Sequence, residues 1–201
     1  MIAPQQQSLF ADDPIRPAGL SYWPDFVAAR TEQQLIDGIR ALPLQPFQFG
    51  AYEGKRKVAS FGFRYDYTSR RLEAAEPVPE WLRDMAGRVE HAQRLGAGSI
   101  QHVLCTAYEV GAGIGWHRDK PQFDLVFGLS LGARCRFRFR RKSGVRWMRF
   151  TLDAEPRSLY LMTGEARHIW EHSIPPVEQP RYSITFRTMA ERPQERLSST
   201  G

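Results

Sequence analysis

The chain has 201 residues, of which 42% are hydrophobic and 25% charged, and its formal net charge is +6. This composition suits a single globular domain and excludes a chain that is disordered throughout. No run reaches the roughly 20 apolar residues of a membrane span, and no secretory signal opens the chain, so we expect no membrane association. Two cysteines, Cys105 and Cys135, are too few for a disulfide framework, which favours a reducing, cytoplasmic location.

The basic residues are mostly arginine: 24 of the 28 are Arg and four are Lys. The planar guanidinium matches the geometry of carboxylates and phosphates, so the excess favours a polyanionic partner or an acidic substrate. A GC-rich genome would produce the same bias, and the count alone does not separate the two explanations.

Two helices are predicted in the N-terminal half. Residues 1–17 are polar and proline-containing without periodicity, which indicates a flexible N-terminal tail. Residues 31–42 place their leucines and isoleucines on one face, as an amphipathic helix does. A second helix is predicted from Pro77 to about Leu95, with a proline near its first turn. Between the helices, residues 47–68 are expected to form strands and turns.

The C-terminal half changes to a period of two, which is typical of strands. The predicted strands are His102–Tyr108, Phe123–Leu131, Cys135–Arg141, Trp147–Leu152, Ser158–Met162 and Tyr182–Met189. Short strands separated by Gly and Pro predict an α+β fold with a double-stranded β-helix (jelly-roll) core and N-terminal helices packed on one side. We expect one domain over residues 18–190 and a flexible C-terminal end at 191–201.

One predicted strand alternates arginine with apolar residues. Between Arg134 and Arg140, every second residue is Arg, and Cys135, Phe137 and Phe139 lie between them. Successive strand side chains point to opposite faces, so the apolar set should pack on the core. The arginines should then face either water or an anion.

A possible metal site is centred on His117-Arg-Asp119, which follows a glycine-rich turn. On extended chain, a His and an Asp two residues apart point the same way and can share one ion. Either His168 or His172 could supply a third ligand from a later strand. Two histidines and one carboxylate are the ligand set of non-haem Fe(II) oxygenases, although each of these histidines, considered alone, is more often structural than a ligand.

The strand Arg181-Tyr-Ser-Ile-Thr-Phe-Arg187 places its two arginines on one face, together with Ser183 and Thr185. Arginines inside a barrel are costly unless they pair with anions. The two stems are separated by roughly 20 Å at about 3.3 Å per residue. Two inward-leaning guanidinium groups could therefore bracket a small dicarboxylate.

Together these motifs resemble the AlkB family of Fe(II)- and 2-oxoglutarate-dependent dioxygenases over roughly residues 45–190. The matching stretches are Tyr108-Glu-Val-Gly, His117-Arg-Asp119, His172-Ser-Ile-Pro and the double-arginine strand ending in Thr-Phe-Arg187. The resemblance implies that His117, Asp119 and His172 ligate iron. His172 is preferred over His168 because it directly precedes the Ser-Ile-Pro segment.

The resemblance also implies a binding site for the cosubstrate 2-oxoglutarate. Arg181 would hold its distal carboxylate, and Arg187 would lie nearer the metal end and Asp119. Tyr108 would touch the cosubstrate as well. Ser183 and Thr106 stand where many members have Asn, and both keep the ability to form hydrogen bonds.

The expected activity is oxidative demethylation of alkylated bases in DNA or RNA, releasing formaldehyde, succinate and CO2. Residues 45–70 resemble the family's substrate-recognition region. A basic run followed by aromatic side chains suits phosphate contact and base stacking. The candidate substrate-binding residues are Lys55, Arg56, Lys57, Phe63, Tyr65 and Tyr67.

One departure from the family concerns the choice of base. Many members carry an acidic residue two positions after the metal-binding Asp, where this chain has Pro121, and Asp124 could substitute. The same oxygenase chemistry on a methylated protein or small molecule therefore stays open. So does a catalytically silent module that only binds nucleic acid.

The expected assembly state is a monomer. The tail segment Gln6–Phe10 resembles the pentapeptide with which bacterial proteins bind the sliding clamp, and a flexible tail ending in Leu-Phe could dock in an apolar pocket.

Overall fold

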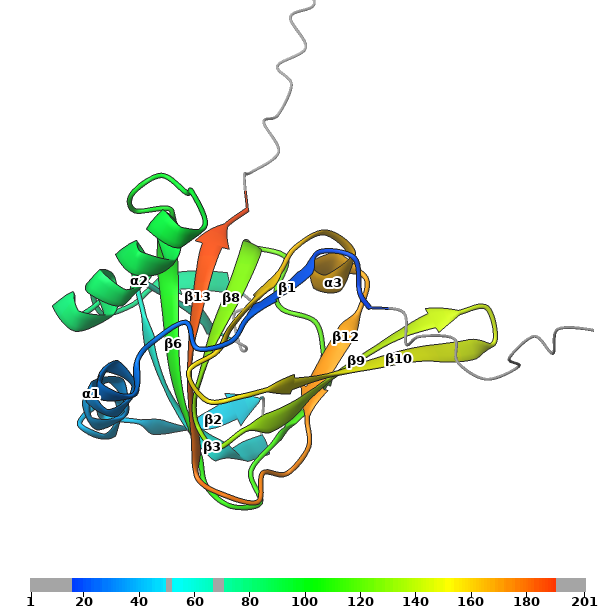
Figure 1. The fold of residues 1–201 in the computed structure, drawn as a ribbon, viewed down its shortest axis with the longest axis horizontal. Coiled ribbons are helices and arrows are strands. Elements are labelled where there is room, and N and C mark those ends of the chain that lie inside the picture. The colour runs from blue at the N-terminus through cyan, green and yellow to red at the C-terminus, as the bar shows by residue number, and fades with distance from the viewer. Residues whose placement is uncertain (1–15, 50–51, 67–70, 191–201) are drawn as a thin grey trace, which may run out of the picture.

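The computed structural model describes residues 16–49, 52–66 and 71–190. Two antiparallel sheets face each other and form the jelly roll (Figure 1). One sheet has seven strands in the order β1-β11-β8-β13-β6-β3-β2, and the other has four in the order β10-β9-β12-β7. The predicted fold class is confirmed. Both tails, and with them the Gln6–Phe10 segment, lie outside the described residues.

The bounds of the elements are as follows. The seven-stranded sheet consists of β1 (Leu20–Trp23), β11 (Leu159–Met162), β8 (Phe123–Gly132), β13 (Arg181–Met189), β6 (Ile100–Tyr108), β3 (Tyr52–Phe61) and β2 (Gln45–Phe49). The four-stranded sheet consists of β10 (Arg146–Ala154), β9 (Cys135–Ser143), β12 (Glu171–Ile174) and β7 (Ile114–His117). A separate ribbon pairs β4 (Phe63–Asp66) with β5 (Arg71–Ala74), and the helices are α1 (Ala29–Arg40), α2 (Glu80–Ala92) and α3 (Gly164–His168).

Helices α1 and α2 cover the outer face of the seven-stranded sheet (Figure 1). Ile39 of α1 and Leu82 of α2 are fully buried in one cluster with Ile184 and Phe186 of β13. Helix α2 begins three residues later than the sequence suggests, because a residue that precedes proline disfavours the helical conformation and Pro79 stands just before the helix. None of the helices in the described part of the chain is long and apolar enough to cross a membrane.

A second hydrophobic cluster fills the space between the two sheets. Phe137 and Phe139 of β9 pack there with Tyr160 and Trp170, and all four are buried. The alternation of β9 is therefore as predicted, with its aromatic residues inside. Strand β13 separates the two clusters, because Ile184 and Phe186 face the helices while its arginines face the interior.

Four strands were not predicted from the sequence: β1, β5, β7 and β12. Each has only four residues, too few for a period-two pattern to be recognised against its surroundings. Strands β7 and β12 are nevertheless central to the site, because each carries one of the candidate metal-binding histidines.

Candidate metal centre

The three candidate metal ligands meet on the inner face of the four-stranded sheet. His117 ends β7 and lies directly opposite His172 of β12 in the strand register. Their ring centroids are 4.3 Å apart. Asp119 follows two residues after His117, and one ligand atom from each of the three residues lies within 4.8 Å of the others. His168 is exposed at the end of α3, so His172 is the histidine that joins the pair.

Hydrogen bonds orient two of these ligands. His117 places Nδ1 3.0 Å from the carbonyl oxygen of Gly115, which directs Nε2 away from its own strand. Arg187 donates from Nε (3.0 Å) and Nη2 (2.6 Å) to Oδ1 of Asp119. The other carboxylate oxygen, Oδ2, lies 3.4 Å from Nε2 of His172. Each ligand thus keeps one atom for an ion.

The electrostatics of the site favour the protonation states that metal binding requires. Burial, together with the nearby His117, lowers the pKa of His172 to about 3. Burial alone would raise the pKa of Asp119, but Arg187 and the two histidines lower it well below its usual value. A neutral imidazole and an ionised carboxylate are the ligand forms of a divalent ion, so the residues present fit Fe(II).

A buried cation beside the triad fits an acidic cosubstrate. Arg181 is 1% exposed, and its Nη2 donates to Oγ of Ser130 at 3.3 Å. Its guanidinium lies over the ring of Tyr108 at 4.8 Å, while Nε and Nη1 find no hydrogen-bond partner among the described residues. Leaving a buried guanidinium without an anion is costly. A carboxylate of 2-oxoglutarate would supply both missing acceptors.

The other predicted cosubstrate residues line the same wall. Thr106 of β6 lies opposite Ser183 of β13 in the register, as Tyr108 lies opposite Arg181. All four are buried. Because paired residues share a face of the sheet, Thr106 and Ser183 present their hydroxyl groups beside Arg181.

Sequence reasoning missed a hydrogen-bonded chain that leads to the metal-binding carboxylate. Nη1 of Arg187 lies 3.2 Å from Nδ1 of His102, and Nε2 of His102 lies 3.0 Å from Oγ of Ser60. Ser60 in turn donates to the carbonyl oxygen of Phe63 at 2.7 Å. Burial lowers the pKa of His102 well below its ordinary value, and Arg187 adds to this effect. The chain joins the start of β4 to Asp119.

Arg167 was also missed. It is 2% exposed, and its guanidinium donates to the carbonyl oxygens of Asp119 (3.2 Å), Lys120 (2.5 Å) and Phe123 (2.7 Å). One side chain of α3 therefore fixes the loop that carries the metal-binding carboxylate. No sequence motif marks this role, because the residues in contact are 44 to 48 positions apart.

The predicted basic substrate residues do not converge on one face. The register pairs Lys57 with Ala107 and Val58 with Thr106, so Lys57 lies on the helix side of β3 and Arg56 on the interior side. Lys57 is exposed and forms an ion pair with Glu109 at 2.7 Å. Arg56 lies over the ring of Phe47 at 3.7 Å. These two cations therefore point to opposite sides of the sheet.

The remaining candidates for substrate contact are placed only in part. Phe63 begins β4 and is half-buried, and Tyr65 belongs to the same strand, but its side chain lies outside the described parts of the structure. Tyr67 lies outside the described residues altogether. Pro121 and Asp124 are both exposed, and neither shows a contact that would identify a base.

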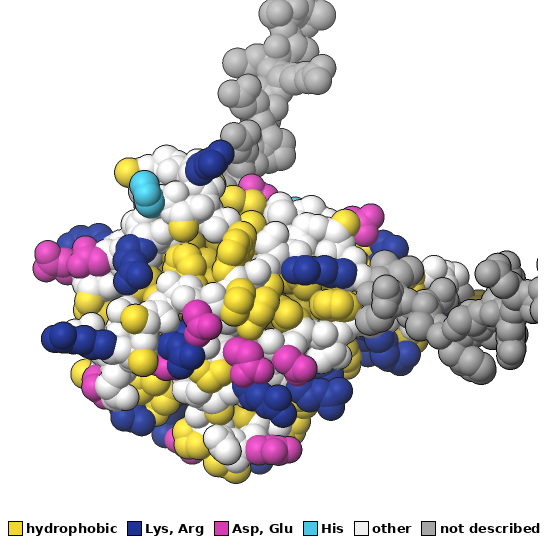
Figure 2. Space-filling model, in the orientation of Figure 1, with side chains coloured by type: hydrophobic (Ala, Val, Ile, Leu, Met, Phe, Trp, Pro, Cys, Tyr) yellow, Lys and Arg dark blue, Asp and Glu magenta, His cyan; other side chains and the backbone are white. Residues whose placement is uncertain are grey.

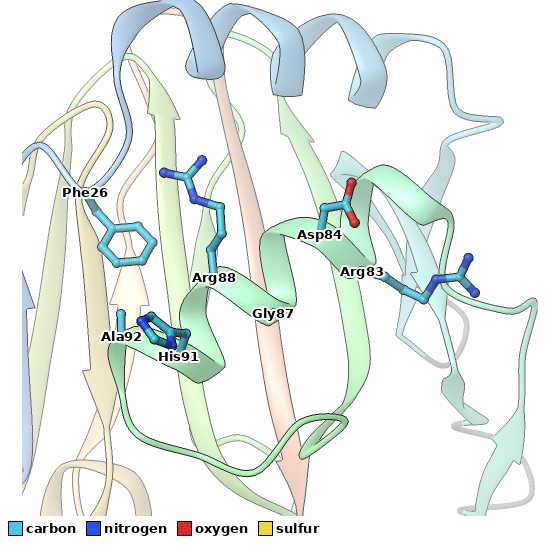
Figure 3. Close-up of a pocket in the computed structure, with 7 residues that line it drawn as sticks. All are labelled: Phe26, Arg83, Asp84, Gly87, Arg88, His91 and Ala92. Atoms are coloured by element: carbon cyan, nitrogen blue, oxygen red, sulfur yellow. The ribbon is translucent and has the colours of Figure 1, made fainter.

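A shallow surface hollow of about 610 Å³ lies elsewhere (Figure 3). Phe26 and the outer side of α2, including Arg83, Asp84 and Arg88, line it. Because α2 packs on the outer face of the seven-stranded sheet, that sheet separates the hollow from the triad. The hollow is therefore no part of the metal centre.

Comparison with known proteins now defines the class. The chain matches the model of the 2OG-Fe(II) oxygenase superfamily over residues 19–198, and it belongs to this superfamily. Within it, the His-Asp-His triad and the relatives described next make it an AlkB-like Fe(II)/2-oxoglutarate dioxygenase. The resemblance, the enzyme class and the cofactors predicted from the sequence are thereby confirmed.

Two curated relatives show how far the similarity extends. The "Alkylated DNA repair protein ALKBH8 homolog" of Arabidopsis thaliana is 29% identical over 188 residues, covering 82% of this chain and 53% of the relative. The mouse "tRNA (carboxymethyluridine(34)-5-O)-methyltransferase ALKBH8" is 28% identical over 169 residues, covering 80% of this chain and 24% of the relative. The chain thus spans about half and about a quarter of these two proteins.

Solved structures share the fold at lower identity. OsALKBH1 superposes with a TM-score of 0.68 at 17% identity, covering 87% of this chain and 98% of that one. A prolyl-4-hydroxylase from Pseudomonas putida superposes with a TM-score of 0.58 at 15% identity, covering 87% and 94%. These likenesses establish the jelly-roll architecture.

Proposed function

We propose that this dioxygenase removes alkyl groups from bases in DNA or RNA by oxidation. The observation that carries the proposal is the pairing of the His117, Asp119 and His172 triad with the buried, incompletely hydrogen-bonded guanidinium of Arg181. When bound, Fe(II) and 2-oxoglutarate supply the oxidising power, with O2 consumed and 2-oxoglutarate converted to succinate and CO2. Hydroxylation of an N-methyl carbon then releases formaldehyde from the base.

The protein's own side chains bind and orient the iron and the 2-oxoglutarate. The triad holds the iron, and Arg187 fixes Asp119 through one oxygen so that the other is available to the ion. Arg181, with Ser130 and Tyr108 beside it, binds the distal carboxylate of 2-oxoglutarate. Thr106 and Ser183 complete that wall. The buried aromatic residues between the sheets exclude water from this side.

The choice of nucleic acid rests on the relatives and on the recognition region. The Arabidopsis relative is named for alkylated DNA repair and the mouse relative for a tRNA nucleoside, and both names concern nucleic acids. Phe63, Tyr65 and Tyr67 would stack on the extruded base, and Arg56, which lies on the interior side of β3, would contact a phosphate near it.

A turnover screen tests this proposal. The protein is incubated with Fe(II), 2-oxoglutarate and methylated single-stranded DNA, methylated tRNA or a methylated peptide, and formaldehyde is measured. We expect release from a nucleic acid, loss of release in His117→Ala, and no loss in the exposed control Arg88→Ser. Release from the peptide alone would overturn the proposed substrate class. Wild-type succinate formation by His117→Ala would overturn the metal site.

A further inference from the structure

The outer face of the four-stranded sheet carries an unusual set of side chains. The register of β9 with β10 and β12 fixes which residues share this face, because the buried residues Phe137 and Phe139 define the opposite one. Its basic members are Arg136, Arg138, Arg140, Lys142 and Arg149, and its acidic members are Asp153 and Glu171. Five positive charges against two negative ones leave a net charge of +3.

Tryptophans lie among these cations. The guanidinium of Arg140 lies 4.4 Å from the ring centre of Trp116 on β7 and 4.5 Å from that of Trp147 on β10. Arg138 lies over the same Trp116 ring at 5.1 Å. Arg140 also forms an ion pair with Glu171 at 2.7 Å, which holds its guanidinium beside the two tryptophan rings. Guanidinium groups and tryptophan rings therefore lie against one another on this face.

Other cations on this face have no internal partner. Arg136 and Arg149 are exposed, and neither forms an ion pair or hydrogen bond with another described side chain. Helices α1 and α2 contact the other sheet, so they leave these cations uncovered. Cationic and anionic side chains are interspersed on the side of the molecule that Figure 2 shows.

We propose that this outer face binds the sugar–phosphate backbone of a single-stranded nucleic acid. Alternate residues of a strand are about 6.7 Å apart, which is close to the spacing of successive phosphates in an extended single strand. Rows of cations with planar aromatic groups between them suit single strands, whose unpaired bases can stack. The net positive charge of this face favours a polyanionic partner, and its tryptophans favour a polyanion that carries bases.

The position of the face connects it to the site. Trp116 directly precedes His117, and Glu171 directly precedes His172, so the face is the reverse side of the two strands that carry the histidine ligands. Strand β7 forms the sheet edge. A strand whose target nucleotide enters the site can pass around this edge. The inference rests on the proposed function for its choice of nucleic acid, but the contact itself needs no turnover.

The test measures binding without catalysis. A fluorescein-labelled, unmethylated 12-nucleotide single-stranded DNA is titrated with protein at several salt concentrations, without iron or 2-oxoglutarate, and anisotropy is recorded. Each phosphate contact with a single strand contributes about 0.7 to the slope of log K against log salt. Arg136→Ser/Arg149→Ser should therefore lower the slope by about 1.4 and weaken binding about 25-fold at 0.1 M salt.

Two matched variants control for charge. Arg83→Ser/Arg88→Ser removes the same charge from the outer side of α2 and should leave the slope unchanged. Arg136→Lys/Arg149→Lys keeps the charge and should keep the slope. Equal losses in both serine pairs, or no measurable binding by the unaltered protein, would overturn the inference.

Two competitors check the class of partner. Single-stranded oligonucleotide should displace the probe more effectively than either duplex or poly-L-glutamate of equal charge. Duplex displacing it more tightly would overturn the single-strand assignment, and equal displacement by poly-L-glutamate would indicate an acidic protein partner instead. Retained binding without formaldehyde release from any nucleic acid would contradict the proposed function and leave this surface standing.

Discussion

Arg187 donates two hydrogen bonds to the same oxygen of Asp119, Oδ1, and leaves Oδ2 facing His172. The two donors come from one rigid guanidinium plane, so the carboxylate is held in one rotation. The pair is also almost buried, with side-chain exposures of 11% and 7%. An ordered carboxylate of this kind is prepared for its metal before the metal arrives.

Replacing Arg187 by Lys should therefore weaken metal binding while the charge is retained. An ammonium group cannot donate from two positions fixed in one plane, and loss of such an orienting partner reduces metal affinity about 10- to 100-fold. Titration with Co(II), followed by its visible spectrum, measures the affinity. The variant Arg88→Lys on the outside of α2 is the control. An affinity equal to that of the unaltered protein would contradict the orienting role.

Arg181 is expected to bind the cosubstrate without stabilising the fold. In the absence of 2-oxoglutarate its buried guanidinium has two nitrogens without partners, so Arg181→Met should leave the melting temperature unchanged or raise it. The same change should abolish the upward shift of melting temperature that 2-oxoglutarate produces in the metal-loaded protein. Thermal melts with and without the cosubstrate measure both effects. An undiminished shift in the variant would show that the distal carboxylate binds elsewhere.

Arg167 is expected to stabilise the loop after the HxD motif. Arg167→Leu leaves the carbonyl oxygens of Asp119, Lys120 and Phe123 without their shared donor. We expect a loss of about 2–4 kcal/mol in the free energy of unfolding, since three carbonyl oxygens would lose a donor and, among the loop and turn contacts of the described residues, only that of Lys120 has another, the backbone N–H of Phe123. Urea denaturation measures the change. The free energy of unfolding of Arg167→Lys, which can satisfy fewer acceptors, should fall between those of the unaltered protein and Arg167→Leu. An Arg167→Leu variant as stable as the unaltered protein would contradict the stabilising role of Arg167.

Gly128 gives Tyr160 the room to lie between the sheets. A Cβ atom at Gly128 would overlap the ring of Tyr160 at Cζ. Gly128→Ala should therefore displace the ring and destabilise the protein by about 1–3 kcal/mol. In Gly87→Ala, on α2, the new Cβ would meet nothing within 4 Å, and that variant should instead gain about 1 kcal/mol. In a Tyr160→Ala variant the ring is absent, so adding Gly128→Ala should cause little further loss of stability. An undiminished loss from Gly128→Ala in that variant would contradict this cause.

Both cysteines should be unreactive in the native protein. Burial raises the pKa of Cys105 to about 12 and raises that of Cys135 as well, although nearby Arg181 opposes the second shift. The thiolate is the reactive form, so labelling by a thiol reagent at pH 8 should proceed only after unfolding. Mass spectrometry before and after addition of urea counts the labelled thiols. Rapid labelling of the folded protein would disprove this expectation.

Local motifs account for what could be predicted from the sequence. The residues of the HxD pair are two positions apart, and the period-two alternation of β13 is enough to place Arg181 and Arg187 on one face. His102, Arg167 and Ser60 were not predicted, because their contacts join strands and loops far apart in the chain. His102 and Arg187, for example, are 85 positions apart. A lone histidine or arginine carries no sign of such a partner.

The basic run at the start of the recognition region illustrates a different limit. Three consecutive cations read as one patch in the sequence, but the pleat of β3 sends Arg56 and Lys57 to opposite sides. The arginines of β9 behave in the reverse way. They are separated by aromatic residues in the sequence, and the same pleat gathers them onto one face. The two-residue period of a strand produces both outcomes, since it separates consecutive side chains and gathers alternate ones.

The direct opposition of His117 and His172 has a consequence for the sheet as well as for the chemistry. Strand β7 is a four-residue edge strand, and among the described residues it pairs in the sheet with β12 alone. Short edge strands detach from a sheet at little cost in free energy. An ion held by both histidines would fasten the edge strand to its neighbour at their shared rung. Loading with iron would then hold β7 against β12. The metal binding that makes the enzyme active would also stabilise the edge of its four-stranded sheet.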